Sequence, residues 1–292
     1  MIIDFRMVPP RGEYMTKAAR KEEARIMKEG FLKGYTRVYR SDTEYLEEWR
    51  ASIAGMIKSM EEAGVDKAIL QAEYGGLHED HHALNRAVLR LHKQYPDKFP
   101  VIFMCVNPHA DEDMVKLVEW GYKKGFRGLN YEAWSVNFSA SESKMWPVYQ
   151  KCQELGMILT LHCSISFNVD RSLYLSHPCH VDKIACDFPD LKIIANHGGW
   201  PWVNELVAIA WKHPNVYIEI GAISPKYIGT PGTGWETLMR YGNTLLQDRV
   251  LFATDCMLPH KRVVDELRAL PLKEEVKEKW LGANAAALLG LK

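Results

Sequence analysis

Eight short apolar segments recur along this 292-residue chain, and they constrain its fold more than any other feature. The segments are residues 1–5, 67–72, 100–106, 126–131, 157–163, 191–197, 216–222 and 250–255. Such nearly continuous apolar runs are typical of strands that are buried on both faces, as in a parallel sheet. Because helix-like stretches separate most of them, the sequence predicts an α/β protein with a (β/α)8 TIM barrel.

The segment before the second strand shows the helical pattern most clearly. Within residues 44–65, apolar side chains recur at the spacing of one helix face, at Leu46, Trp49, Ile53, Met56, Ile57 and Met60. Gly64 follows as a C-terminal stop. Two later segments end in the same way, at Gly125 and Gly156, which predicts a helix before each of these glycines.

The whole chain, residues 1–292, is predicted to form a single barrel domain. Residues 9–45 interrupt the alternation of strands and helices as a long, charged insertion after the first strand. A shorter insertion follows the seventh strand at 224–235. A long insertion at the catalytic end of a barrel is typical of a lid or a subunit contact. We therefore expect a homo-oligomer.

Composition excludes several classes of function. Lys plus Arg and Asp plus Glu are both 37, so no basic excess favours binding to nucleic acid or to an anionic membrane. The apolar runs are too short to span a bilayer, and the N-terminus starts directly on a strand pattern. Six cysteines lie scattered without a C-x-x-C pair, which favours reduced thiols in a cytoplasmic protein.

Polar side chains gather where the predicted strands end, and that end of a barrel is where its chemistry lies. In chain order they are Arg6, Glu73, Asn107, Asn130, Glu132, His162, His197 and Asp255, with Glu219 inside the seventh strand. Two histidines and an aspartate thus close three of the last four strands. Residues of these types at one rim predict a functional site.

Four segments carry a resemblance to a known family. They are DFPDLKIIANHGGWPW (187–202), LTLHCS (159–164), VLFATDCMLPH (250–260) and LGANAAALLGL (281–291). The chain resembles the amidohydrolase-related (amidohydrolase 2) family, with its metal-dependent-hydrolase-like barrel. The resemblance is to enzymes like aminocarboxymuconate-semialdehyde decarboxylase and pyrone-dicarboxylate lactonase. It implies hydrolysis or non-oxidative decarboxylation of a small carboxylated substrate, aromatic or unsaturated.

The resemblance also implies roles for three residues. His162 matches a metal ligand, His197 matches a histidine that binds or polarises substrate or water, and Asp255 matches an aspartate that binds metal and transfers protons. These three are the predicted catalytic residues. A divalent ion such as Zn or Mn, held by His162 and Asp255, is one implied cofactor, because imidazole and carboxylate suit such an ion.

The first strand departs from the family pattern. Members usually carry Asp-x-His-x-His there, whereas this chain keeps Asp4 but has Arg6 and Val8 in place of the two histidines. Arginine stays protonated and donates no lone pair. At about 5 Å and an effective dielectric of about 20, its charge would repel a divalent ion by roughly 6–7 kcal/mol. The sequence therefore favours metal-independent catalysis.

Two roles are open for Arg6: its planar fork could bind a substrate carboxylate, or it could pair with Asp255 and fill the vacated metal position. Asn130, Glu132 and Trp200 complete the predicted substrate-binding set. Glu132 fits either a general acid or a helix-start cap. Trp200 fits either a wall against a planar substrate or ordinary packing.

Further histidines are expected to have no part in catalysis. His177 and His180 are expected to cap the loop after the fifth strand, and the run HEDHH at 78–82 is expected to be a solvated helix start. A second function also stays open. The altered first strand would suit a barrel that has lost catalysis and binds a small ligand or a partner without turnover.

Overall fold

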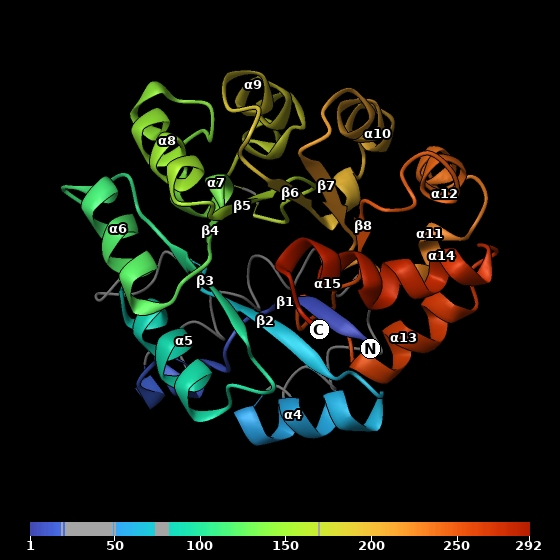
Figure 1. Cartoon of the computed structure of the whole chain (residues 1–292), viewed down its shortest axis with the longest axis horizontal. Coiled ribbons are helices and arrows are strands. Elements are labelled where there is room, and N and C mark those ends of the chain that lie inside the picture. Colours follow the sequence, from blue (N-terminus) through green and yellow to red (C-terminus); the bar gives the residue numbers. More distant parts are fainter. Residues whose placement is uncertain (19, 21–48, 50, 74–81, 169) are drawn as a thin grey trace.

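The computed structural model describes residues 1–18, 20, 49, 51–73, 82–168 and 170–292, and it confirms the predicted barrel (Figure 1). Eight parallel strands pair in chain order as one sheet. They are β1 (Ile3–Met7), β2 (Lys67–Gln71), β3 (Val101–Cys105), β4 (Gly128–Tyr131), β5 (Ile158–His162), β6 (Ile193–Asn196), β7 (Val216–Glu219) and β8 (Val250–Leu251). The ring closes where the Phe5 amide donates to the Phe252 carbonyl at 2.9 Å.

Helices surround the strands (Figure 1). The α-helices are α4 (Ile53–Glu62), α5 (Ala83–Gln94), α6 (Met114–Lys124), α7 (Ala133–Val136), α8 (Trp146–Glu154), α9 (Cys179–Asp187), α10 (Val203–Lys212), α11 (Pro225–Ile228), α12 (Glu236–Gly242), α13 (His260–Arg268), α14 (Glu274–Glu278) and α15 (Asn284–Leu289). Short turns η1 (Arg11–Glu13), η2 (Ser143–Met145), η3 (Leu173–Ser176) and η4 (His197–Gly199) and the π-turn η5 (Lys279–Ala283) complete the set.

The helix predicted within residues 44–65 begins later than its apolar spacing suggests. The Ser52 side chain accepts the Gly55 amide at 3.1 Å and caps α4, which therefore starts at Ile53. Trp49 lies in a turn before the cap, so its placement on the helix face was wrong. The predicted stop is confirmed, because Gly64 adopts a left-handed φ of 70° just beyond the helix.

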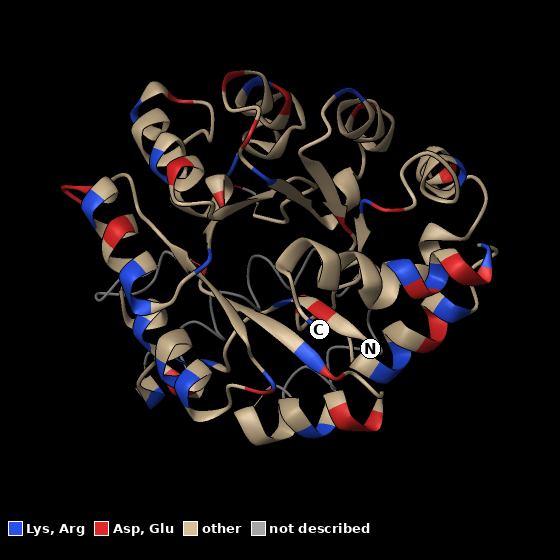
Figure 2. Ribbon diagram, viewed as in Figure 1, with Lys and Arg blue, Asp and Glu red and all other residues tan. Residues whose placement is uncertain are grey.

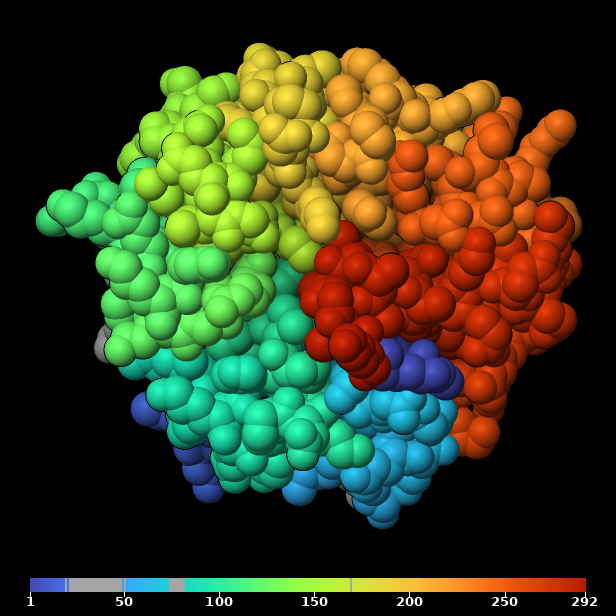
Figure 3. All heavy atoms as spheres, in the orientation of Figure 1, coloured from blue at the N-terminus to red at the C-terminus, as the bar shows by residue number. Residues whose placement is uncertain are grey.

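The barrel interior is filled at its N-terminal end. Apolar side chains from the strands form one buried cluster there with two residues of α15, namely Ile3, Phe5, Ile69, Val101, Phe103, Ile158, Ile194, Leu251, Ala253, Ala285 and Leu288. Gly128 makes room for this packing, since a Cβ there would lie 2.5 Å from the Phe103 ring. Helix α15 lies across this end in Figures 1 and 3. The C-terminal ends of the strands are thus left for chemistry.

A shift in register redirects the first strand. Simple alternation would place Asp4 and Arg6 on the same face. The pairing of β1 with β2 instead slips between Asp4 and Met7, as at a β-bulge. Arg6 therefore reaches side chains of the barrel interior, while Asp4 contacts His260 at the start of α13.

Most of the 9–45 insertion, residues 19 and 21–45, lies outside the described residues, as does most of the HEDHH run. A lid, a subunit contact and a homo-oligomer stay predictions, as do the single-domain organisation and the cytoplasmic location. In the described parts of the chain, no helix has both the length and the apolar character needed to cross a bilayer. Figure 2 shows basic and acidic residues interspersed along the outer helices.

Candidate active site

Arg6 is the centre of the polar network at the C-terminal end of the barrel. Its guanidinium is 1% exposed and directs all five N–H groups at protein oxygens. The acceptors are Asp255 and Glu132 at 2.6 Å, Glu73 at 3.0 Å, and Gln71 and Asn130 at 3.1 Å. Burial lowers the pKa of Arg6, but Asp255, Glu132 and Glu73 together raise it well above its ordinary value.

This geometry distinguishes the two roles that the sequence left open for Arg6. The ion pair with Asp255 is present, at 2.6 Å from Nε to Oδ1. The carboxylate clamp is not supported, because no guanidinium N–H remains for a substrate once the five protein oxygens have been bound. Arg6 is a buried internal cation, and its assignment as a substrate-binding residue stays a prediction.

Asp255 is held in a strained backbone conformation. Its φ of 54° and that of Cys256, also 54°, are left-handed, which costs a non-glycine residue about 1–3 kcal/mol. The Asp255 amide donates to the Arg6 carbonyl at 3.1 Å, so backbone and side chain are both anchored on β1. Strain of this kind is concentrated at functional sites.

His162 and His197 lie together at the ends of β5 and β6. Their ring centroids are 4.7 Å apart, and the His162 ring also packs edge-on against Trp134. Burial is the main cause that lowers the pKa of each, and Arg6 lowers both further. Asp255 raises the pKa of His197, but the pKa still stays below its ordinary value. Both imidazoles are therefore neutral at pH 7.

The tautomer of His197 follows from its partner. Nδ1 lies 3.0 Å from the Gly221 carbonyl, which can only accept, so Nδ1 carries the proton. Nε2 consequently keeps its lone pair. The corresponding contact of His162 Nδ1 is with the Ser176 hydroxyl at 2.8 Å, where either group can donate.

The turn after β6 holds His197 in place. His197, Gly198 and Gly199 have successive left-handed φ values of 66°, 65° and 83°. A Cβ at Gly198 would lie 2.5 Å from the Trp235 ring, so the glycine permits both the turn and the packing of the 224–235 loop on it. Trp200 follows, half-buried, with its indole N–H donating to the Thr233 carbonyl at 3.2 Å.

Glu132 and Asn130 lie beside Arg6, and Glu132 occupies the N-cap position of α7 without capping it through its side chain. The second Glu132 oxygen accepts the Trp134 indole N–H at 2.8 Å, and the Glu132 side chain makes no capping hydrogen bond to α7. Asn130 accepts from the Thr160 hydroxyl at 2.8 Å and donates to the Ala72 carbonyl at 3.0 Å. Both are buried and prearranged by the protein.

Sequence reasoning did not assign a role to Glu219. It is fully buried, and burial raises the pKa of its carboxyl to about 8. Oε1 accepts the Gly221 amide, while Oε2 lies 4.0 Å from His197 Nδ1 without a hydrogen bond. The signal in the sequence was a carboxylate within an otherwise apolar strand.

Asp4 and His260 form a second unassigned pair behind the site. Asp4 accepts the backbone amides of Arg6 and Thr254, at 3.0 and 3.1 Å, and lies 3.2 Å from His260 Nε2. His260 Nδ1 contacts the Ser59 hydroxyl at 2.9 Å. Asp4 therefore ties β1 to the end of β8, where Arg6 and Asp255 project.

These residues do not fit a divalent ion at the mouth of the barrel. Asp255 Oδ1 is bound to Arg6, and Val8 offers only an aliphatic side chain. Among the described residues, no three ligand-type side chains converge there. An added ion would compete with a buried guanidinium for the same carboxylates. The tentative metal pair of His162 and Asp255 is not supported by this geometry.

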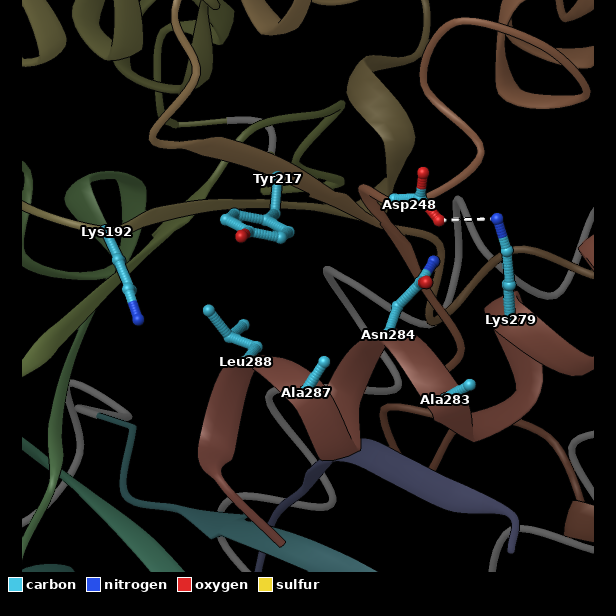
Figure 4. A pocket seen from close by; sticks show the side chains of 8 residues that line it. All are labelled: Lys192, Tyr217, Asp248, Lys279, Ala283, Asn284, Ala287 and Leu288. Atoms are coloured by element: carbon cyan, nitrogen blue, oxygen red, sulfur yellow. Dashed lines mark ion pairs between the residues drawn. The ribbon is translucent and has the colours of Figure 1, made fainter.

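The remaining candidates lie apart from this cluster. His177 accepts the Cys179 amide at 3.1 Å and His180 contacts the Tyr174 carbonyl at 2.7 Å, so both act as the expected loop caps. A surface hollow opens near the other end of the barrel (Figure 4). Its lining residues are Lys192, Tyr217, Asp248, Lys279, Ala283, Asn284, Ala287 and Leu288. None of them belongs to the strand-end network.

The fold and the position of this network at the strand ends are those of a TIM-barrel enzyme. The family model described as amidohydrolase matches residues 35–291, so the chain belongs to the amidohydrolase-related family, as its motifs predicted. A curated relative, the protein fluG of Emericella nidulans, is 26% identical over 98 residues. That match covers 33% of this chain and 11% of the relative, about a tenth of its length.

Solved structures share the fold over nearly the whole chain. An uncharacterised TIM-barrel protein from Bordetella bronchiseptica is 24% identical, with a TM-score of 0.77 over 99% of this chain and 98% of its own. The 5-carboxyvanillate decarboxylase of Sphingomonas paucimobilis is 15% identical, with a TM-score of 0.70 over 100% of this chain and 99% of its own. The 5-carboxyvanillate decarboxylase of Novosphingobium aromaticivorans, solved with bound manganese and a nitrobenzoic acid, is 18% identical. Its TM-score is 0.69 over 100% of this chain and 97% of its own.

Proposed function

We propose that this chain catalyses the metal-independent, non-oxidative decarboxylation of a small carboxylated molecule with an aromatic or unsaturated skeleton. The observation that carries this proposal is the meeting of two imidazoles with Asp255 beside a fixed cation. The ring centroids of His162 and His197 are 4.7 Å apart, and Asp255 Oδ1 lies 2.6 Å from Arg6 Nε. Relatives of the same fold that decarboxylate carboxylated aromatics support the reaction class.

In this reaction a proton replaces carbon dioxide on one carbon of the substrate. Asp255 first takes up a proton from solvent and then transfers it to that carbon; the C–C bond breaks, its electron pair returns to the skeleton, and carbon dioxide leaves. His197 Nε2 and the His162 ring orient the substrate. Trp134 and Trp200 form walls against its plane, and solvent returns the proton to Asp255.

Arg6 replaces the charge that a metal would supply elsewhere in the family. Its guanidinium fixes Asp255, Glu132 and Glu73 in one arrangement. It also leaves these oxygens no room for a divalent ion. Solved relatives contain manganese, so this chain would reach a related reaction with a different cation.

Hydrolysis is the second candidate, because a specific observation favours it. The lone pair on His197 Nε2 could accept a proton from water near Asp255, and a hydratase and a hydrolase occur among the solved structures of this fold. A barrel that binds its ligand without turnover is the remaining alternative. The retention of both histidines and Asp255 argues against it.

A panel of hydroxylated benzoic acids and unsaturated dicarboxylic acids, assayed in D2O, separates these reactions. Decarboxylation predicts release of carbon dioxide and one deuterium on the carbon that loses it. Hydrolysis would instead place oxygen from labelled water in the product. We expect Asp255→Asn to reduce turnover by about 10²–10⁴-fold, as for loss of a proton-transfer group. Binding without turnover, unchanged in Asp255→Asn, would reject catalysis.

A further inference from the structure

We propose that Asp182, Cys186 and His213 form a binding site for a divalent ion such as zinc on the outside of the barrel, between α9 and the end of α10. This site is separate from the proposed active site. Among the described residues, these three side chains alone bring ligand atoms of His, Cys, Asp or Glu together as a set of three, all within 4.8 Å of one another.

The sequence explains why the ligands converge. Asp182 and Cys186 are four residues apart on α9, so they lie on the same helix face. His213 follows the last residue of α10 and turns its ring toward that face. Its Nε2 lies 2.7 Å from Asp182 Oδ1 and 3.9 Å from Cys186 Sγ. All three ligand atoms thus lie within 4.8 Å of one another.

A protein cation already lies beside two of these ligands. The Lys212 ammonium lies 2.7 Å from Asp182 Oδ1 and 3.7 Å from Cys186 Sγ. The Lys212 side chain is 55% exposed, so it can swing into solvent. Exposed ion pairs contribute little to stability, so a metal would displace the ammonium at little cost.

The chemistry of the ligands selects the ion. One imidazole nitrogen, one sulfur and one carboxylate oxygen suit Zn²⁺ or Co²⁺, with water as the fourth ligand, better than the all-oxygen preference of Mg²⁺ or Ca²⁺. On binding, the Cys186 thiol loses its proton to solvent, and the imidazole proton moves from Nε2 to Nδ1. The ion would link α9 to α10 and stabilise this side of the barrel.

Cobalt titration of the chelator-treated full chain tests the proposal, because a thiolate ligand gives an absorption band that oxygen and nitrogen ligands do not. We expect one Co²⁺ per chain with this band, displaced by Zn²⁺. Cys186→Ser should abolish the band, whereas the control Cys179→Ser, which changes an exposed cysteine on the same helix, should keep it. His213→Gln should weaken binding by roughly tenfold or more, and Lys212→Ala should tighten it.

Thermal unfolding provides a second measurement. Zn²⁺ should raise the Tm of the wild type and of Cys179→Ser, but not that of Cys186→Ser. The proposal is wrong if the wild type shows no thiolate band, if Cys186→Ser keeps it, or if zinc binds only adventitiously, with the same Tm shift in Cys186→Ser. Asp255→Asn should leave the band unchanged, so failure here is distinguishable from failure of the proposed decarboxylation.

Discussion

The Arg6 guanidinium donates to five acceptors at or just beyond the ends of β2, β4 and β8. It therefore both neutralises their charge and holds these strand ends together. A buried charge network is strongly destabilised when one partner is removed, because the others stay desolvated and unpaired. The loss of stability on removing Arg6 is therefore a direct test of whether its guanidinium organises the site.

We expect Arg6→Met to reduce the free energy of unfolding by about 3–5 kcal/mol, since it leaves the buried Glu132 and the mostly buried Asp255 without their counter-charge. Arg90→Met is the matched control. Arg90 pairs with Glu13 at 2.6 Å but is about half exposed, so its loss should cost about 0–1 kcal/mol. Urea unfolding measures both. Equal losses would show that the Arg6 network contributes no more than a surface pair.

Glu219 predicts a pH dependence of stability. Its pKa is raised from 4.5 to about 8 in the folded state, chiefly by burial, so the folded protein holds this proton more tightly than the unfolded chain. The stability that results is present below about pH 4.5 and is lost as the pH rises toward 8. Because a tenfold difference in proton affinity corresponds to about 1.4 kcal/mol, the loss reaches about 5 kcal/mol at most.

Glu219→Gln removes the titration while it keeps the shape of the side chain. We expect the variant to lose less stability than the wild type between pH 5 and pH 9, measured by urea unfolding at each pH. Parallel pH profiles for the two proteins would contradict the assignment of this dependence to Glu219.

At the scale of elements, the turn η4 positions His197 through two glycines. Gly198→Ala would place a Cβ 2.5 Å from the Trp235 ring in a backbone with φ of 65°. Gly64→Ala is the control, since Gly64 has φ of 70° but nothing within 4 Å of the added carbon. Both variants bear left-handed strain of about 1–2 kcal/mol. Gly198→Ala should lose a further 1–3 kcal/mol or so from overpacking.

Activity distinguishes the same two variants. Gly198→Ala should also reduce turnover, because the clash displaces the turn that carries His197. Gly64→Ala should keep full turnover, since Gly64 ends α4 away from the strand-end network. The positional role of η4 would be refuted by a Gly198→Ala protein that is as active as the wild type.

The elements differ in how far the sequence predicted them. Apolar runs gave all eight strands, because a strand buried on both faces leaves a local signal. The predicted start of α4 was wrong because the Ser52 cap, one side-chain hydrogen bond, begins the helix at Ile53, later than the apolar spacing suggests. The register shift after Asp4 depends on pairing with β2, and simple alternation contains no information about that pairing.

At the scale of the whole molecule, the candidate site was predictable where its residues close strands. His162, His197, Asp255, Asn130 and Glu132 all lie at strand ends, which a parallel barrel brings to one rim. The saturation of Arg6 was not predictable, since its five acceptors come from distant segments. The pair of Asp4 and His260 escaped notice for the same reason, because β1 and α13 meet only in the closed barrel.

The proposed function requires that the Arg6 guanidinium take the place of the family's metal ion. Elemental analysis of Cys186→Ser protein, purified without added metal, tests it most directly, because this background removes the proposed outer site. We predict far less than one divalent ion per chain, and turnover that withstands chelation. One tightly held ion per chain in this variant, with activity lost on chelation and restored by manganese, would contradict the claim.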